Sequence, residues 1–183
     1  LNCLGLEYFC FSGDGLWEKA IAATGRQPGD YTSKLNIRLE PEMRADAAVR
    51  RVMLDLFHAM QVNEQGTIED LDSEFLHDFR VAVRRTRSAL TELKWVFPPA
   101  TLKRFKREFA WLGSITTKLR DLDVYLIKFN RYKGMLPDEL REGLEPLRGF
   151  LRDKQKIEQS RHLAVQLQSA RYRRPKQQWP RYL

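Results

Sequence analysis

Apolar residues recur at helical spacing along most of this 183-residue chain. Leu102, Phe105, Phe109 and Leu112, for example, are three or four residues apart, so they share one face of a helix. The alternation of apolar and polar residues that marks a strand is confined to the short segment KLNIRL at residues 34–39. The pattern therefore predicts an all-α fold, an antiparallel helical bundle.

Interruptions of this spacing divide the chain into three parts. Residues 1–41 contain several glycines and are interpreted as a linker or the remnant of an upstream domain. Residues 42–174 hold the helices, and residues 175–183 are predicted to be a truncated tail because Pro175 and Pro180 interrupt a helix. The predicted helices cover residues 42–60, 73–98, 102–113, 117–131, a short stretch around 140–147, and 149–174. The segment NEQGTIEDLDSE, residues 63–74, is predicted to be a loop in which Asp72 or Ser73 caps the next helix.

The excess positive charge of the chain is confined to two segments. The formal net charge is +8, from 32 basic and 24 acidic residues. Residues 77–107 hold nine basic and two acidic residues, and residues 152–183 hold the same numbers, so each segment carries +7. Charge gathered in this way favours an anionic partner over a uniformly basic surface.

Other features of the composition exclude several classes. No apolar run is long enough to cross a membrane. Cys3 and Cys10 lack a C-x-x-C spacing, and no secretory leader is evident, which indicates a reducing, cytoplasmic compartment. The three histidines are too widely spread to suggest a metal site, and no serine or cysteine is placed to form a catalytic triad. We therefore expect neither a cofactor nor catalysis.

The segment FLHDFRVAVRRTRSAL, residues 75–90, carries an unusual concentration of arginine. If this segment is a helix, one face begins at His77 and continues with Arg80, Arg84 and Arg87. Arg85 lies on a different face. This cationic stripe lies directly beside the apolar stripe of the same helix, made by Leu76, Phe79, Val83 and Leu90. Charges in that position lie at the edge of a bundle seam, and the planar guanidinium of arginine suits phosphate contacts. A solvated surface face is the alternative interpretation.

A second segment, LGSITTKLRDLDVYL at residues 112–126, combines one arginine with two aspartates. Asp121 and Asp123 are about 200° apart on a helix, so they cannot share a ligand directly. Asp123 is three residues from Arg120 and is expected to brace it. Asp121 is expected to lie near a helix start, where the helix dipole favours a carboxylate. Both aspartates are therefore interpreted as structural.

These two segments, followed by LQSARYRR, resemble the conserved histidine α-helical domain, the CHAD family. The resemblance covers about residues 42–174, with the three segments in the family's order. It implies a fold of two pseudo-symmetric four-helix halves, of which this chain supplies the N-terminal half. It also implies a non-catalytic module that binds inorganic polyphosphate in a basic groove and associates with polyphosphate granules. GRQPGDYTSKLNIRLEP resembles the linker that follows a triphosphate-tunnel (CYTH) domain in fusion proteins, so an upstream enzyme domain is expected outside this chain.

The same resemblance assigns the candidate polyphosphate-binding residues. They are the histidine and arginines of the three segments: His77, Arg80, Arg84, Arg85, Arg87, Arg120 and Arg171.

A helical nucleic-acid-binding protein is the competing hypothesis. Arginines together with Trp95, Trp111 and Trp179 would suit phosphate contacts and base stacking. The arginine helix, however, has no asparagine or glutamine with which to read base edges.

Overall fold

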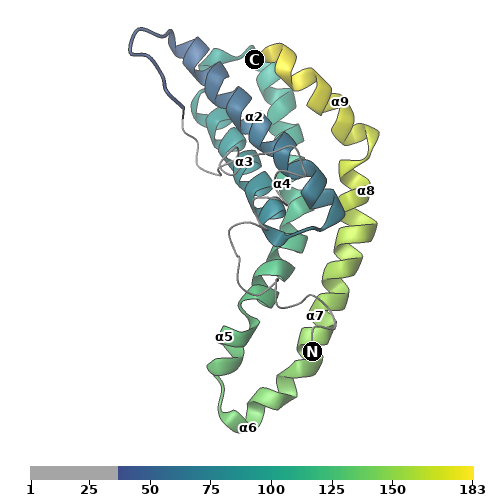
Figure 1. Cartoon of the computed structure of the whole chain (residues 1–183). Coiled ribbons are helices and arrows are strands. Elements are labelled where there is room, and N and C mark those ends of the chain that lie inside the picture. Colours follow the sequence, from purple (N-terminus) through teal and green to yellow (C-terminus); the bar gives the residue numbers. More distant parts are fainter. Residues whose placement is uncertain (1–36) are drawn as a thin grey trace, which may run out of the picture. The chain divides into compact units, whose positions relative to one another are not determined.

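The computed structural model describes residues 37–183, and within that range the chain is helical with no strand. The predicted all-α fold is thus confirmed, while residues 1–36 of the predicted linker lie outside the described part. Figure 1 shows the arrangement of the elements. The helices are α2 (Ala45–Glu69), α3 (Ser73–Glu92), α4 (Pro99–Ile127), α5 (Phe129–Gly134), α6 (Asp138–Arg141), α7 (Glu145–Ile157), α8 (Ala164–Leu167) and α9 (Ala170–Gln178). Short 3-10 turns cover Lys94–Val96, Glu142–Leu144 and Trp179–Tyr182, and Glu158–Leu163 is π-helical.

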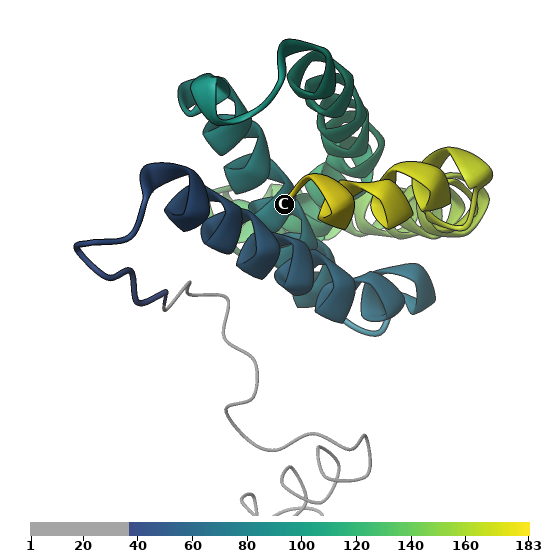
Figure 2. The same cartoon turned by 90° about the horizontal axis from the view of Figure 1, so that it is seen from above.

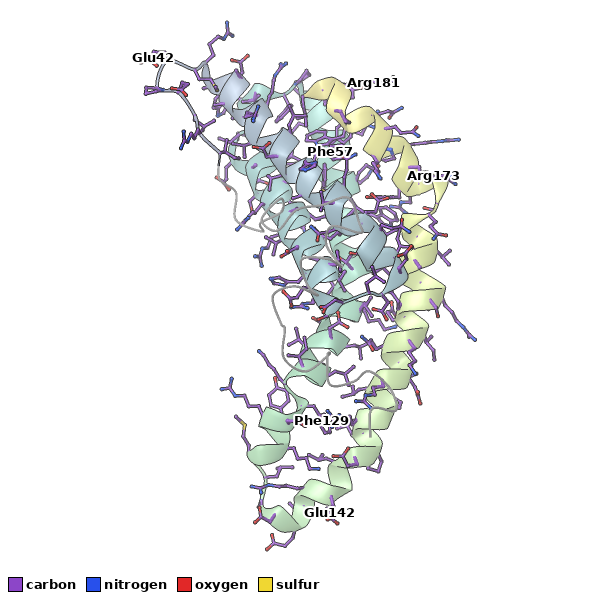
Figure 3. All side chains as sticks on the ribbon, in the orientation of Figure 1. Glu42, Phe57, Phe129, Glu142, Arg173 and Arg181 are labelled. Atoms are coloured by element: carbon purple, nitrogen blue, oxygen red, sulfur yellow. The ribbon has the colours of Figure 1, made fainter. Side chains whose placement is uncertain are left out.

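The helices α2, α3 and α4 pack on one another through their apolar faces, and the chain then returns along them through α7, α8 and α9. The core between them contains fully buried residues from each of the three helices, among them Met53, Phe79 and Phe105. Phe129 is the first residue of α5 (Figure 3). The guanidinium carbon of Arg148, from α7, lies 5.2 Å from its ring centroid.

The first helix is longer than predicted, and the expectation of a loop over residues 63–74 is wrong. Helix α2 continues through Gly66 to Glu69 and ends at Asp70, whose φ of 53° is left-handed. The Thr67 hydroxyl donates to the carbonyl of Asn63 at 2.7 Å, within the helix. A Cβ on Gly66 would lie 2.4 Å from the ring of Phe75, so the glycine allows α3 to approach α2 closely. Tertiary packing outweighs the low helix propensity of glycine, about 1 kcal/mol relative to alanine.

The predicted break at Gly113 is also wrong, because α4 is one helix of 29 residues. The hydroxyls of Thr116 and Thr117 donate to carbonyls three or four residues back, at 2.8–3.1 Å, and so remain within the helical bonding pattern. Phe109, Leu112 and Leu119 on either side of the glycine are buried. Asp121 consequently lies well inside α4 and not near a helix start, so the dipole interpretation of its carboxylate is corrected.

The returning part of the chain is more segmented than the predicted helix over residues 149–174. It consists of α7, the π-helical segment, α8 and α9, with Ser169 capping α9 by accepting from the backbone amide of Tyr172 at 3.4 Å. Pro175 does not end α9, which runs on to Gln178. The predicted helix over residues 117–131 likewise divides at Lys128, between α4 and α5.

The last residues of the chain are part of the folded unit. In Figure 2, α9 runs across the other helices and ends between α2 and α4. Trp179 is 1% exposed, and its ring centroid lies 4.6 Å from that of Phe105, 5.3 Å from that of Phe109 and 5.9 Å from that of Phe97. The C-terminal segment therefore closes one side of the core.

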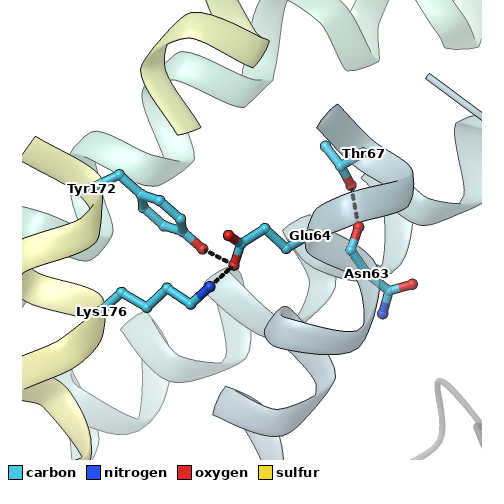
Figure 4. Close-up of polar contacts among 5 residues, drawn as sticks. All are labelled: Asn63, Glu64, Thr67, Tyr172 and Lys176. Carbon is cyan, nitrogen blue, oxygen red and sulfur yellow. Dashed lines mark hydrogen bonds and ion pairs between the residues drawn. The ribbon is translucent and has the colours of Figure 1, made fainter. Parts of the chain in front are cut away.

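Polar contacts join α9 to α2 beside this aromatic cluster. The Tyr172 hydroxyl donates to Glu64 Oε2 at 2.8 Å, and Lys176 Nζ pairs with the same oxygen (Figure 4). Burial, together with the neighbouring Glu64 carboxylate, raises the pKa of Tyr172 well above its ordinary value. The phenol therefore stays protonated and remains a hydrogen-bond donor.

We expect Trp179→Ala to lower the free energy of unfolding by about 3–5 kcal/mol, because the substitution leaves a cavity against three aromatic rings. Trp95→Ala is the matched control, since Trp95 is 62% exposed and its removal should change stability by no more than about 0.5 kcal/mol. Urea unfolding followed by circular dichroism measures both. Equal effects of the two substitutions would contradict the placement of the C-terminal segment in the core.

Candidate anion-binding groove

A groove of about 500 Å³ lies between α3 and α4. Its walls contain five of the seven candidate residues, and none of the described residues that line it is acidic. The cationic and histidine side chains are His77, Arg80, Arg84, Arg87 and Arg120. The rest of the lining is supplied by small and hydroxyl-bearing residues of α4 and by valines: Val81, Val83, Ala110, Gly113, Ser114, Thr116, Thr117 and Val124.

Arg80 links the two walls of the groove. Its Nη1 donates to the Thr116 hydroxyl at 2.7 Å, to the Thr117 hydroxyl at 3.2 Å and to the carbonyl of Gly113 at 3.2 Å. Partial burial lowers the pKa of the guanidinium, and the Asp121 carboxylate opposes that shift. Arginine nevertheless stays charged at any physiological pH, so the groove holds a fixed positive charge in a set position.

Arg120 approaches the head of α3 from the opposite wall. Its Nη1 donates to the carbonyl of Ser73 at 3.2 Å, and its Nη2 lies 3.1 Å from His77 Nδ1. Because an arginine nitrogen can only donate, His77 accepts at Nδ1 and its proton resides on Nε2. With Nδ1 accepting from Arg120, His77 presents an N–H donor from Nε2.

Arg84 and Arg87 are exposed, and no described residue forms an ion pair with either. A Cβ on Gly113 would lie 2.8 Å from Nη1 of Arg87, so the glycine lets this guanidinium lie against the backbone of α4. The groove therefore combines two arginines held by protein acceptors with two whose guanidinium groups are open to a ligand.

The other two candidate residues lie outside this groove. Arg85, on the same helix, does not line it. The guanidinium carbon of Arg171 lies 4.2 Å from the ring centroid of Trp111, where it borders a separate, small apolar pocket. The structure thus gathers His77, Arg80, Arg84, Arg87 and Arg120, and leaves Arg85 and Arg171 apart.

Asp123 is buried behind the groove and contacts a partner that sequence reasoning did not identify. It is 4% exposed and accepts a hydrogen bond from Gln155 of α7 at 2.8 Å. Burial raises the pKa of its carboxyl, the bond from Gln155 and the charge of Arg120 lower it, and Asp70 and Asp72 raise it. The expected bracing of Arg120 is thus electrostatic, since the hydrogen bonds of Arg120 go to Ser73 and His77.

Within residues 37–183 the structure contains neither a cluster of metal-binding side chains nor a helix that could cross a membrane. No group of three or more histidine, cysteine, aspartate or glutamate side chains there is placed to hold a metal ion. In the same range, none of the helices combines the length and apolar character that crossing a bilayer requires.

The fold and groove define a helical unit with a cationic seam, and comparison with known proteins specifies its family. A model of the CHAD domain family matches residues 51–183, so the chain belongs to the CHAD domain family. The crystal structure of the CHAD domain from the plant Ricinus communis is similar, with 28% sequence identity and a TM-score of 0.68. The match covers 83% of this chain and 49% of that chain, so this chain spans about half the length of the plant protein. No match was found among curated proteins.

We expect the stability of the protein to depend on pH through Asp123. Its pKa is higher in the folded state than in the unfolded state, where it is about 3.9. The folded state therefore binds this proton more tightly, and its contribution to stability is lost as pH rises through the folded-state pKa. Asp123→Asn removes the titration and keeps an acceptor for Gln155, so the variant should gain stability relative to the wild type as pH rises above about 4.

Urea unfolding of the two proteins across that pH range measures the difference. Asp153→Asn, an exposed aspartate of α7, is the control and should follow the wild-type curve. Parallel curves for Asp123→Asn and the wild type would contradict the raised pKa of the buried carboxyl.

Proposed function

We propose that the groove between α3 and α4 binds inorganic polyphosphate and that the domain acts as a binding module, not as an enzyme. The main support is the lining of the groove, which has four arginines and one histidine and no acidic residue among those described. Association with polyphosphate granules would follow from the same binding. The resemblance to CHAD domains supports the same ligand.

The chemistry of the groove suits a flexible chain of phosphates. Arg84 and Arg87 are one turn apart on α3, so their planar guanidinium groups can contact successive phosphoryl units. Arg80 and Arg120 add positive charge that is fixed in place by protein acceptors. His77 can donate from Nε2 while Nδ1 accepts from Arg120. Binding of this kind is driven by charge neutralisation and the release of counterions.

The tryptophans weigh against nucleic acid as the natural ligand. Of the three that could stack on bases, Trp179 is buried in the core and Trp111 is covered by Arg171. Trp95 alone of the three is exposed, and it lies outside the groove. Sequence-independent phosphate contact thus has more support than recognition of bases.

Replacement of a groove arginine should weaken binding of polyphosphate and reduce its dependence on salt. For Arg84→Gln we expect the slope of log affinity against log salt concentration to become shallower by about 0.7–0.9. Arg85→Gln is the matched control, one residue further on the same helix but outside the groove, and its slope should equal that of the wild type. Fluorescence anisotropy with labelled polyphosphate at several salt concentrations measures the three slopes.

A competition measurement tests the choice of ligand. Polyphosphate should displace labelled single-stranded DNA at equal phosphate concentration, and DNA should fail to displace labelled polyphosphate. The reverse order would favour the nucleic-acid hypothesis. An affinity that does not change with salt would contradict polyanion binding altogether.

A further inference from the structure

We infer that the anion-binding track continues beyond the groove in one direction only, over the first half of α4 toward the turn between α3 and α4. A polyphosphate longer than the groove would then gain contacts with Lys94, Lys103 and Lys106. This inference rests on the proposed function and adds to it a preference for long chains.

The register of α3 against α4 places these lysines in line with the groove. Arg120 contacts His77, Thr117 contacts Arg80, and Gly113 lies under Arg87, so the two helices are antiparallel. Each step toward the C-terminus of α3 therefore meets an earlier residue of α4. The next position in this register pairs Thr91 with Lys106, one turn of α4 before Ala110, and Lys103 follows one turn further. Lys94 lies in the 3-10 turn directly after α3.

Helical spacing gives the same result for α4 alone. Lys106 precedes Ala110 by four residues and Gly113 by seven, so it occupies the face of α4 that lines the groove. Lys103 precedes Ala110 by seven residues, so it lies near the same face. No described residue forms an ion pair with Lys94, Lys103 or Lys106, and Glu92 is the one acidic residue in positions 88–107. Beyond Arg87 the surface thus remains cationic.

Carboxylates lie on the segment that leads into α3 at the opposite end of the groove. Past His77 and Arg120 lie Asp70 and Asp72, close enough to Asp123 for their charges to raise its pKa. Asp121 of α4 is near enough to act on Arg80. A polyanion that extended past this end would meet carboxylates, which repel it, so only the end toward the α3–α4 turn can accommodate a longer chain.

The distances involved define short and long ligands. At 1.5 Å per residue, His77 to Arg87 spans about 15 Å along α3, and Arg120 to Lys103 spans about 26 Å along α4. A short oligophosphate can therefore satisfy the groove without reaching the lysines. A long chain occupies the groove and the lysine positions together.

The test compares sodium tripolyphosphate with long-chain polyphosphate on the double variant Lys103→Gln/Lys106→Gln. For the long chain, the slope of log affinity against log salt should become shallower by about 1.4–1.8, twice the effect of one cation. Affinity for tripolyphosphate should be unchanged. Lys128→Gln is the control, because this lysine follows the last residue of α4 beyond the opposite end of the groove, and it should alter binding of neither ligand.

Each other outcome overturns a defined part of the inference. If the double variant binds both ligands like the wild type, the extended track is overturned. A shallower salt slope in Arg84→Gln would still support the proposed function. Equal weakening of tripolyphosphate and long-chain binding in the double variant would overturn the separation of groove and extension. An effect of Lys128→Gln equal to that of the lysine substitutions would overturn the single direction, and no binding by the wild type would overturn both proposals.

Discussion

Burial of the apolar face of α3 holds the cationic residues of that helix at its seam with α4. Like charges three or four residues apart cost a helix about 0.2–0.5 kcal/mol for each pair. Burial of Leu76, Phe79, Val83 and Leu90 contributes about 1.5–3 kcal/mol for each side chain. Because the arginine stripe lies beside this buried stripe, packing fixes the arginines at the edge of the core and outweighs their mutual repulsion several-fold.

The arginines of the seam then divide by their partners. Arg80 and Arg120 are held by carbonyls, hydroxyls and a histidine nitrogen. These side chains therefore lose their conformational entropy when the protein folds and not when a ligand binds. Arg84 and Arg87 remain exposed and are available to a ligand. A groove built in this way presents fixed positive charge together with adaptable contacts, which suits a ligand whose phosphates repeat but whose conformation varies.

Local signals in the sequence predicted the start of α3 and its Asp72 cap, because helical periodicity and capping act within a few residues. The same rules misjudged Gly66, Gly113 and Pro175, all of which lie inside helices. At Gly66 and Gly113 a close approach by another helix decides the structure, and that approach depends on residues distant in sequence. For the same reason the sequence could not predict that Arg171 packs on Trp111 or that Gln155 bonds to Asp123. Both contacts depend on how α7 and α9 return along the bundle.

The returning helices contribute rigidity to the groove without entering it. Gln155 bonds to Asp123 behind the groove, Lys118 pairs with Glu158 at 2.6 Å, and Gln159 donates to the carbonyl of Thr67 at 2.6 Å. These contacts fix α7 and the π-helical segment to α4 and α2, while the described residues that line the groove all belong to α3 and α4. Substitutions that remove exposed groove charges therefore leave the core packing intact. Loss of the contacts at the back would instead loosen the two helices whose spacing sets the positions of the arginines.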